Sequence, residues 1–342
     1  MTIKEIAKLT GVSVATVSRC INQPDKVSPA TRDRITQVVR RMGYVPNASA
    51  QSLSTGQTRT IACVVPTLSN EFFSQLVEGS QKVFSMAGYK LQIYSLNSLP
   101  PEQRKPDQQG VDGMILYVSD FRTSKEVRDY LQSIQVPYVL IGNPDQMRLD
   151  RPPISVYMED YEGVQMALRY LYAEGNRHFG VLAASGNSFV SDHRIQAAED
   201  FFRLHPDCTC QIEFVDYGDQ LSQSLVSTAR LLAYETRPTA MITFNDMMAV
   251  GAIRCLKTRG LRVPEDMEII GFDDIPLASY VTPALSTIAA PNRRLGEKAA
   301  ELLLRRLACN MDFTQCVLYP VELRLRETTK NLASGEVCRG FF

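Results

Sequence analysis

Tryptophan is absent from this chain of 342 residues, and histidine occurs only three times, as His178, His193 and His205. None of these histidines belongs to a zinc-protease or nucleophile-elbow motif. The glycine-rich loops that hold dinucleotides or nucleoside triphosphates are also missing. These absences count against an enzyme, and we expect neither a cofactor nor a bound metal.

Long apolar runs are missing as well. No stretch approaches the roughly 18 consecutive apolar residues of a membrane span, and the charged start MTIKEIAKLTG is unlike a secretory signal. We therefore expect a cytoplasmic protein with no membrane contact. The eight cysteines agree with a reducing compartment, because no pair has CxxC spacing, and Cys208 with Cys210 leaves a zinc site as a minor alternative.

The net charge of zero conceals an uneven distribution. Residues 1–58 contain eight basic and three acidic residues, a charge of +5, and the remainder contains 29 basic and 34 acidic residues, a charge of −5. A small basic head on a larger acidic body suggests that the head binds a polyanion, although an ordinary charged surface would give the same count.

Helix-start and helix-stop signals divide the head into three short helices. Thr2 and Glu5 form a capping box, and Gly11 ends the first helix. Ser28 and Pro29 give the third helix its N-cap and first residue. Three short helices with a tight first turn are typical of a helix-turn-helix unit, although a generic three-helix bundle is the alternative.

The second helix carries an unusual mixture of small apolar and hydroxyl side chains. Val17 and Ile21 form its inward stripe, so the other side chains must face outward. A DNA major groove offers thymine methyl groups to small apolar side chains, purine edges to arginine and phosphates to hydroxyls. The residues expected to contact DNA are Ser13, Val14, Ala15, Thr16, Ser18, Arg19 and Asn22.

A linker, YVPNASAQSLSTGQTRT, follows the head at residues 44–60. Its proline and asparagine can start a short helix that runs to Leu53, although the small-residue composition is equally typical of a flexible linker.

From Thr60 onward, apolar runs alternate with helical periodicity. The runs predict strands at 61–65, 91–94, 114–118, 138–141, 179–182, 241–244 and 269–272. Helical stretches lie between them, at 71–87, 161–174, 192–204, 223–235, 246–259 and 292–307. Repeated βαβ units indicate parallel sheets with helices on both faces.

Ligands of such sheets bind beyond the carboxyl ends of the strands. This rule selects residues that follow predicted strands: Phe72, Phe73, Gly142, Asn143, Asn245, Asp246, Asp273 and Asp274, together with Arg194 at the start of a helix. Aromatic rings and a few polar groups suit a small polar ligand. Each residue also has a simpler explanation, because paired phenylalanines are often helix core and an aspartate after a strand is often a helix cap. Arg194 could likewise only pair with a neighbouring carboxylate such as Asp192.

The sequence resembles the lactose/galactose repressor (LacI/GalR) family. Residues 1–60 resemble its DNA-binding head and hinge through IKEIAKLTGVSVATVSRCIN, VSPATRDRI and MGYVPNASAQSL. The body resembles its effector domain, and the periplasmic sugar-binding proteins, through PTLSNEFFSQLVEG, PTAMITFNDMMAVGAIRCLKTRGLRVPEDMEIIGFDD and PALSTIAAPNRRLGEKAAELLL.

The resemblance implies an all-α helix-turn-helix head plus hinge helix, followed by a two-lobed, periplasmic-binding-protein-like α/β domain with parallel sheets. The implied boundaries are 1–45 for the head, 46–59 for the hinge, 60–330 for the effector-binding and dimerisation domain, and 331–342 for a flexible tail. The chain would cross between the lobes three times. The first lobe would hold 61–158 and 290–318, and the second 159–288 and 320–329.

The resemblance also implies site residues and partners. In the hinge, Asn47, Ala50 and Leu53 would lie at the DNA, with Leu53 wedged into the minor groove of an operator. In the body, Phe73, Arg194, Asn245 and Asp273 would contact a small-molecule effector, with Phe72 beside them. The expected protein is a ligand-responsive repressor that binds a pseudo-palindromic operator as a homodimer.

Four positions depart from the family pattern. Gln51 stands where arginine is common, Gly142 and Asn143 stand where aspartate and arginine are usual, and Ala290 replaces a glutamine. The segment 97–113 is also short, so the second helix of the first lobe is expected to be lost or stunted. A sugar, a sugar acid or a sugar phosphate held by Arg194 would fit this pattern.

Two other classes of protein remain as alternatives. An enzyme could act on a small polar metabolite in the α/β domain, with Asp273 and Asp274 as an acid/base pair. An architectural DNA-binding protein would have no need for so large a body. Product analysis of any ligand that stabilises the body separates a regulator from an enzyme.

Overall fold

The structure, a computed structural model, describes residues 2–22, 24–44, 56–96, 107, 110–117, 124–147, 152–184, 189–216, 219–309 and 314–330. The chain forms two compact units, one of Met1–Arg59 with Gly110–Asp112 and one of the remaining residues. Most of the predicted hinge, most of the short segment 97–113 and the tail lie outside the described residues. No described helix is long and apolar enough to span a bilayer.

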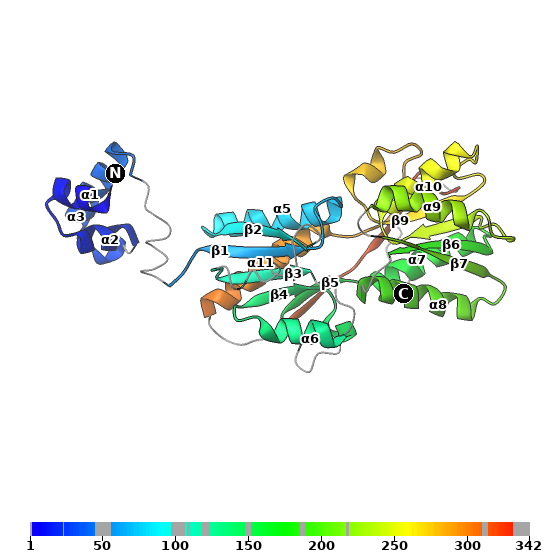
Figure 1. The fold of residues 1–342 in the computed structure, drawn as a ribbon, viewed down its shortest axis with the longest axis horizontal. Coiled ribbons are helices and arrows are strands. Elements are labelled where there is room, and N and C mark those ends of the chain that lie inside the picture. Colours follow the sequence, from blue (N-terminus) through cyan, green and yellow to red (C-terminus); the bar gives the residue numbers. More distant parts are fainter. Residues whose placement is uncertain are drawn as a thin grey trace. The chain divides into compact units, whose positions relative to one another are not determined.

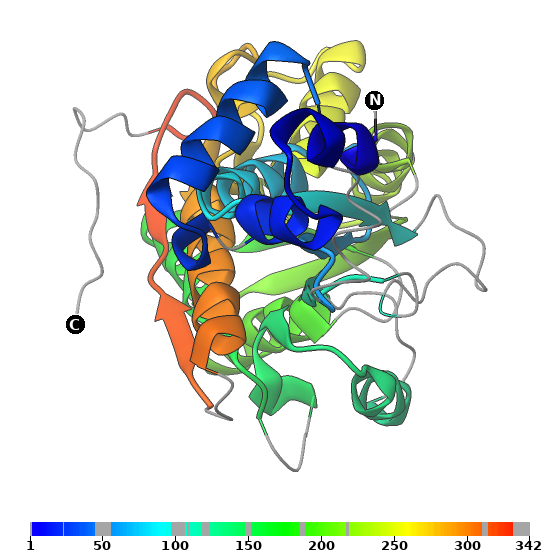
Figure 2. The same cartoon turned by 90° about the vertical axis from the view of Figure 1, so that its left-hand side faces the viewer.

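The head contains α1 (Ile3–Thr10), α2 (Val14–Asn22), the 3-10 turn η1 (Pro24–Lys26) and α3 (Pro29–Arg41), coloured blue in Figures 1 and 2. The backbone N–H of Thr2 donates to the Glu5 carboxylate at 2.8 Å, so the capping-box residues meet as predicted. Gly11 ends α1 with a φ of 67°, in the left-handed region that favours glycine. The head has its own core, centred on Ile6, Val17 and Ile35.

Two six-stranded sheets form the body (Figure 1). The first has the order β11-β5-β4-β3-β1-β2 and consists of β1 (Thr60–Val65), β2 (Lys90–Ser95), β3 (Gly113–Tyr117), β4 (Tyr138–Ile141), β5 (Ser155–Met158) and β11 (Cys316–Tyr319). The second has the order β12-β10-β9-β8-β6-β7 and consists of β6 (His178–Ala184), β7 (Thr209–Val215), β8 (Ala240–Thr243), β9 (Glu268–Asp273), β10 (Ser286–Ala289) and β12 (Glu322–Arg324). Within the described strands, all pairs are parallel except the antiparallel β10–β12 pair.

Helices connect these strands. They are α5 (Glu71–Met86), α6 (Ser124–Ser133), α7 (Asp160–Ala173), α8 (Phe189–Leu204), α9 (Gln220–Leu231), α10 (Asp246–Thr258) and α11 (Asn292–Cys309), with 3-10 turns η5 (Pro144–Met147) and η6 (Pro276–Ser279). α5 packs on α11, α7 on α8 and α9 on α10. The seven predicted strands and six predicted helices are all present, with ends that differ by up to four residues.

The predicted division into two lobes is confirmed. The chain leaves the first sheet after β5, returns through α11 to β11, and leaves again for β12, which makes three crossings. The crossings follow Met158, Ala289 and Tyr319, close to the predicted limits. Because the crossings bring α11 back to the first lobe, residues at its start follow directly from the second-lobe strand β10.

α5 and α11 pack unusually closely in the first lobe. A Cβ atom on Gly79 would lie 2.2 Å from the carbonyl oxygen of Arg293, and one on Gly296 would lie 2.0 Å from that of Leu76. The Ser80 hydroxyl donates to the carbonyl oxygens of Leu76 at 2.9 Å and Gly296 at 3.1 Å. The two glycines therefore allow the helix backbones to touch.

Candidate functional site

The outward face of α2 carries the predicted base-reading residues. Val14, Ala15 and Arg19 are exposed, whereas Val17 and Cys20 are buried against the other head helices. This pattern confirms the predicted orientation of the helix. The exposed side chains combine small apolar groups with a guanidinium, which is the chemistry that reads thymine methyl groups and guanine edges.

The hydroxyls at the start of α2 are engaged locally. The Thr16 backbone N–H donates to the Ser13 hydroxyl at 3.1 Å, and the two side-chain hydroxyls lie 2.9 Å apart. Ser13 is thus the N-cap of α2, as predicted. Ser18 is half-buried. The other predicted DNA contacts lie outside the described residues: the side chain of Asn22, and Asn47, Ala50 and Leu53 in the hinge.

A buried cluster in the second lobe contains two of the predicted effector residues. We call Arg194, Asp160, Asp273 and Phe272 the Arg194 cluster. The Arg194 Nε and Nη2 atoms donate to Asp160 Oδ1 at 2.8 and 2.5 Å, and Nη2 lies 4.0 Å from Asp273 Oδ1. The guanidinium stacks on the Phe272 ring, 3.5 Å from its centre, and Nη1 donates to the carbonyl oxygen of Phe244.

The fold explains how these residues meet. Phe272 and Asp273 end β9, Phe244 follows β8, Asp160 begins α7 and Arg194 lies in the first turns of α8. The carboxyl ends of neighbouring parallel strands share one edge of a sheet, and helices begin there, so residues distant in sequence converge. The sequence suggested Asp192 as a simple structural partner of Arg194, which is wrong, because the partner is Asp160.

Burial controls the protonation of two carboxyl groups here. Burial is the main cause that raises the pKa of Asp273 to about 7; the Arg194 charge lowers it and the Asp160 charge raises it. Burial and then the charge of Asp273 raise the pKa of Asp246 well above its usual range, although its carboxylate accepts hydrogen bonds from Thr287 and Ile275. The cluster is therefore rich in carboxyl groups relative to its single guanidinium.

Asn245 lies beside the cluster but also caps a helix. It directly follows Phe244, its side chain is buried, and its Oδ1 accepts from the Met248 backbone N–H at 2.9 Å, at the start of α10. The cap occupies the oxygen and leaves the amide group available to a ligand. Asn143 is similar, because its Oδ1 accepts from the Asp145 backbone N–H at 3.0 Å within a turn.

The phenylalanine pair belongs to the first-lobe core. Phe72 and Phe73 lie in the first turn of α5, both are buried, and their rings meet edge to face with centres 5.0 Å apart. Phe73 also packs edge to face on Tyr117, at the end of β3, with centres 4.9 Å apart. The structure thus gives both phenylalanines a packing role in the first lobe, with Tyr117 as their neighbour.

Asp274 points away from Asp273. Its carboxylate forms ion pairs with Arg324 and, at 2.6 Å, with Arg326. Adjacent carboxyl groups that face different partners cannot act together on one substrate. This geometry removes the acid/base pair on which the enzyme alternative depended.

Sequence reasoning missed Asp160, Tyr117 and Asn292. The first begins a helix directly after β5 and the second ends a strand, so the strand-end rule could have found both. Asn292 donates its amide to the carbonyl oxygen of Asp273 at 2.9 Å. It follows a strand, β10, that the sequence analysis did not predict.

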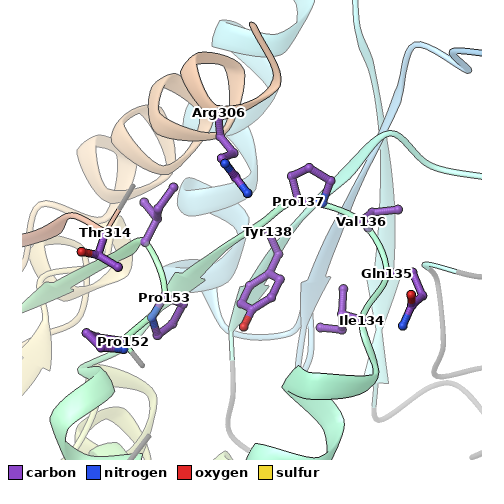
Figure 3. A pocket seen from close by; sticks show the side chains of 10 residues that line it. Ile134, Gln135, Val136, Pro137, Tyr138, Pro152, Pro153, Arg306 and Thr314 are labelled. Atoms are coloured by element: carbon purple, nitrogen blue, oxygen red, sulfur yellow. The ribbon is translucent and has the colours of Figure 1, made fainter. Parts of the chain in front are cut away.

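A separate cavity of about 350 Å³ lies in the first lobe (Figure 3). Its lining includes Pro137 and Tyr138 at the start of β4, Ile154 before β5, Thr314 before β11, and Arg306 of α11. The cavity is at the amino ends of these strands, the opposite end from that at which ligands of parallel sheets bind. It is therefore not the predicted effector site.

Comparisons with known proteins agree with this architecture. Residues 2–47 match the family model "Bacterial regulatory proteins, lacI family", and residues 168–329 match "Periplasmic binding protein-like domain". The HTH-type transcriptional repressor PurR of Vibrio cholerae serotype O1 is 31% identical over 98% of this chain and 99% of its own length. This chain belongs to the LacI family.

Further relatives cover the same span. PurR of Aliivibrio fischeri strain ES114 is 33% identical over 90% of this chain and 91% of its own. The structure of the lac repressor dimer bound to operator and the anti-inducer ONPF superimposes with a TM-score of 0.83 and 26% identity, over 96% of this chain and 99% of that one. A complex of the regulator CelR with cellobiose gives a TM-score of 0.69 at 25% identity, again over 96% and 99%. This LacI-family chain is thus a DNA-binding transcriptional regulator and not an enzyme.

Proposed function

We propose that this LacI-family protein is a cytoplasmic repressor that binds a pseudo-palindromic operator as a homodimer, and that a neutral sugar controls its affinity for DNA. Residues 1–45 bind the DNA, 46–59 form the hinge, and 60–330 bind the effector and the second subunit. Dimerisation is supported by the lac repressor, which is a dimer on its operator, and by the match between twofold proteins and palindromic sites.

The Arg194 cluster is the observation that carries the choice of effector. Three of the guanidinium N–H groups already donate to Asp160 and to the carbonyl oxygen of Phe244. Asp273 lies close enough to share its charge. An arginine so fully paired is a poor anchor for a carboxylate or phosphate group.

The same cluster suits a ligand with several hydroxyl groups. Asp273 accepts hydrogen bonds from hydroxyls, while the remaining arginine N–H groups and the Asn245 amide donate to hydroxyl oxygens. Above about pH 7, an additional anion would be repelled by the carboxylates of Asp160 and Asp273, which outnumber the single guanidinium. Neutral sugars therefore take precedence over the sugar acids and sugar phosphates that the sequence also allowed, and the cellobiose bound to CelR is of this class.

On the DNA side, Val14 and Ala15 contact bases, Arg19 reads a guanine edge, and Ser13, Thr16 and Ser18 contact phosphates or cap α2. Asn22 belongs to the same surface. In the hinge, Asn47, Ala50 and Leu53 lie at the minor groove when two subunits occupy the operator.

Substitution of Arg194 tests the effector assignment. A thermal-shift screen against neutral sugars, sugar acids, sugar phosphates and nucleosides first identifies the effector, with product analysis to exclude turnover. Operator affinity is then measured with and without that compound. We expect Arg194→Ala to abolish the effector-induced change, while binding to the operator without effector stays within about threefold, because the head is a separate unit.

Two further variants distinguish a loss of effector binding from a loss of folding. Arg194→Ala leaves the Asp160 carboxylate buried without its partner, so it should also lower the melting temperature. Asp273→Asn preserves shape and should weaken the effector response with a smaller loss of stability. Arg203→Ala removes an exposed arginine from the same helix and should change neither property. An Arg194→Ala protein that keeps the full effector response would overturn the assignment.

A further inference from the structure

Asn292 is a buried asparagine with only one end of its amide satisfied. It is the first residue of α11 and is 2% exposed. Its Nδ2 donates to the backbone carbonyl oxygen of Asp273 at 2.9 Å. Its Oδ1 is fully enclosed and has no hydrogen-bond partner among the described residues. Buried acceptors without partners are rare in native proteins because burial removes their hydrogen bonds to water.

The orientation of this amide is fixed by chemistry. A carbonyl oxygen can only accept a hydrogen bond, so the group that faces the Asp273 carbonyl must be the NH₂ group of Asn292. The oxygen of the amide is therefore the free end. Its unused lone pairs are directed away from the contact with Asp273 and can be satisfied only by a donor.

The carbonyl that Asn292 holds belongs to a strained turn. Asp273 and Asp274 have φ angles of 107° and 51°, in the region that favours glycine. The turn is held from three sides: Asp246 accepts from the Ile275 backbone N–H at 2.9 Å, Arg326 pairs with Asp274, and Asn292 donates to Asp273. Strain that several groups maintain in this way commonly marks a functional site.

Asn292 is also the member of this group that comes from the first lobe. α11 packs on α5 and on strands of the first sheet, whereas Asp273 ends a strand of the second sheet. Arg194, Asn245 and Asp273 are as deeply buried as Asn292. Because Asn292 contacts Asp273, a ligand bound at Asp273 can meet side chains from both lobes.

We propose that Asn292 is a specificity-determining ligand contact: its Oδ1 accepts a hydrogen bond from one hydroxyl of the sugar whose other hydroxyls bind the Arg194 cluster. The inference rests on the proposed function and adds to it an acceptor from the first lobe. A sugar that bridges Asn292 and Asp273 ties the start of α11 to the second lobe. A sugar that lacks this hydroxyl leaves the buried oxygen unsatisfied and binds more weakly.

The test is a double cycle between Asn292 and the hydroxyls of the ligand. The probe is the tightest binder among D-ribose, D-xylose, D-glucose, D-galactose and cellobiose, together with its monodeoxy analogues, titrated by calorimetry into the full-length protein. In the wild type, one deoxy analogue should bind about tenfold more weakly than the parent sugar. In Asn292→Leu, which has a similar volume and no polar atoms, the parent sugar and that analogue should bind equally well.

Matched variants separate a ligand contact from a structural role. If Asn292→Leu does not fold, Asn292→Ala serves as the second test variant. It should also abolish the difference in affinity between the parent sugar and the deoxy analogue. Asn176→Ala deletes another buried asparagine of the body, whose amide is fully hydrogen-bonded to Leu171, Glu268 and Thr239. It should lower the melting temperature and keep the wild-type discrimination among deoxy analogues.

The outcomes distinguish the two hypotheses. If the parent sugar binds and every deoxy analogue keeps its wild-type penalty in both Asn292 variants, Asn292 is structural and the inference is wrong, while the proposed function stands. If none of the five sugars binds the wild type, the neutral-sugar function fails and the Asn292 contact fails with it.

Discussion

The carboxyl group of Asp273 lies buried 4.0 Å from the Arg194 guanidinium, which also pairs with Asp160, and the Asp273 backbone has a positive φ. Burial raises its pKa to about 7. In the unfolded chain an aspartate has a pKa of about 3.9, so the folded state holds the proton more tightly. The contribution of this group to stability is therefore most favourable at low pH, and it is lost progressively as the pH rises from about 4 to about 7.

Effector binding should have the opposite pH dependence. A sugar hydroxyl donates a stronger hydrogen bond to the ionised carboxylate of Asp273 than to the protonated acid, so the effector affinity should rise as the pH increases through about 7 and level off above it. Calorimetric titrations between pH 5.5 and 8.5 measure this. The expected slope on the acid side is at most about tenfold in affinity per pH unit.

Neighbouring groups decide how this experiment is controlled. Arg194 stays charged throughout. Burial has the larger effect on its neighbour His193 and lowers the pKa of that side chain, although the charge of Asp160 raises it. Burial, and then the charge of Asp273, raise the pKa of Asp246 well above its usual range. Asp273→Asn should therefore make the affinity independent of pH. A wild-type affinity that does not vary across pH 7 would contradict the assignment of Asp273 as an acceptor.

At the scale of elements, the contact between α5 and α11 depends on glycine. Alanine usually stabilises a helix interior by about 1 kcal/mol relative to glycine. At Gly296 the sign should reverse, because the added Cβ would lie 2.0 Å from the Leu76 carbonyl oxygen and must push the helices apart. We expect Gly296→Ala to lower the free energy of unfolding by about 1–3 kcal/mol in urea titrations.

An exposed position on the same helix provides the comparison. Glu301→Ala should change the free energy of unfolding by no more than about 0.5 kcal/mol, because its side chain is exposed and, among the described residues, its ion pair is the one with Lys298. A Gly296→Ala protein as stable as the wild type would mean that α5 and α11 can separate without cost.

The recognition helix α2 should determine which operator is chosen. Val14 and Ala15 are exposed and take no part in the head core. The double variant Val14→Gln with Ala15→Arg should therefore alter the preferred half-site while the head stays folded. Selection from random DNA gives the consensus, and circular dichroism reports the folding. Arg19→Ala should relax the preference at one base pair, at a cost of about 1–3 kcal/mol. An unchanged consensus for the double variant would place these residues away from the bases.

The strength of the sequence signal explains which elements could be predicted. The seven predicted strands are apolar runs in the interiors of the sheets, apart from β2 at an edge. Of the strands that the apolar runs did not predict, β7, β11 and β12 lie at sheet edges, where one side has no partner and polar residues are tolerated. β5 and β10 begin with serine, so they lack the apolar run that marks the equally short strands β4 and β8.

The candidate site was predictable to the extent that the strand-end rule applies. Asn245 and Asp273 follow or end strands whose sequences are clearly apolar. The Arg194–Asp160 pair and the Asn292 contact join residues 34 and 19 positions apart. Such pairings depend on the order of strands in the sheet, which no local pattern contains, and this is why Asp192, a near neighbour in sequence, was the wrong choice of partner.

At the scale of the whole molecule, the boundary between the basic head and the acidic body coincides with the boundary between the two compact units. The basic residues of the first 58 positions accompany a head with its own small core, and the body forms a separate unit. The head alone can bind DNA only weakly and without much selectivity, because phosphate contacts are shared by all sequences. Selectivity must come from base contacts and from the deformation of the operator. In the dimer that we propose, the body holds two heads together for this purpose.

Leu53 is the residue through which we expect the two heads to cooperate. We propose that the hinge places it at the centre of the operator, where the leucines of two subunits would wedge into the minor groove and bend the DNA. Deformation of this kind is favourable only at a site whose sequence bends easily and whose half-sites engage both heads. Leu53→Ala should therefore weaken operator binding at least about tenfold and change binding to random DNA by less than about twofold.

Titrations at two salt concentrations, with both DNAs, provide the measurement, since the phosphate contribution should have the same salt dependence in the variant and the wild type. Equal losses on operator and random DNA would show that Leu53 only packs within the linker, and the operator would then be selected by α2 alone.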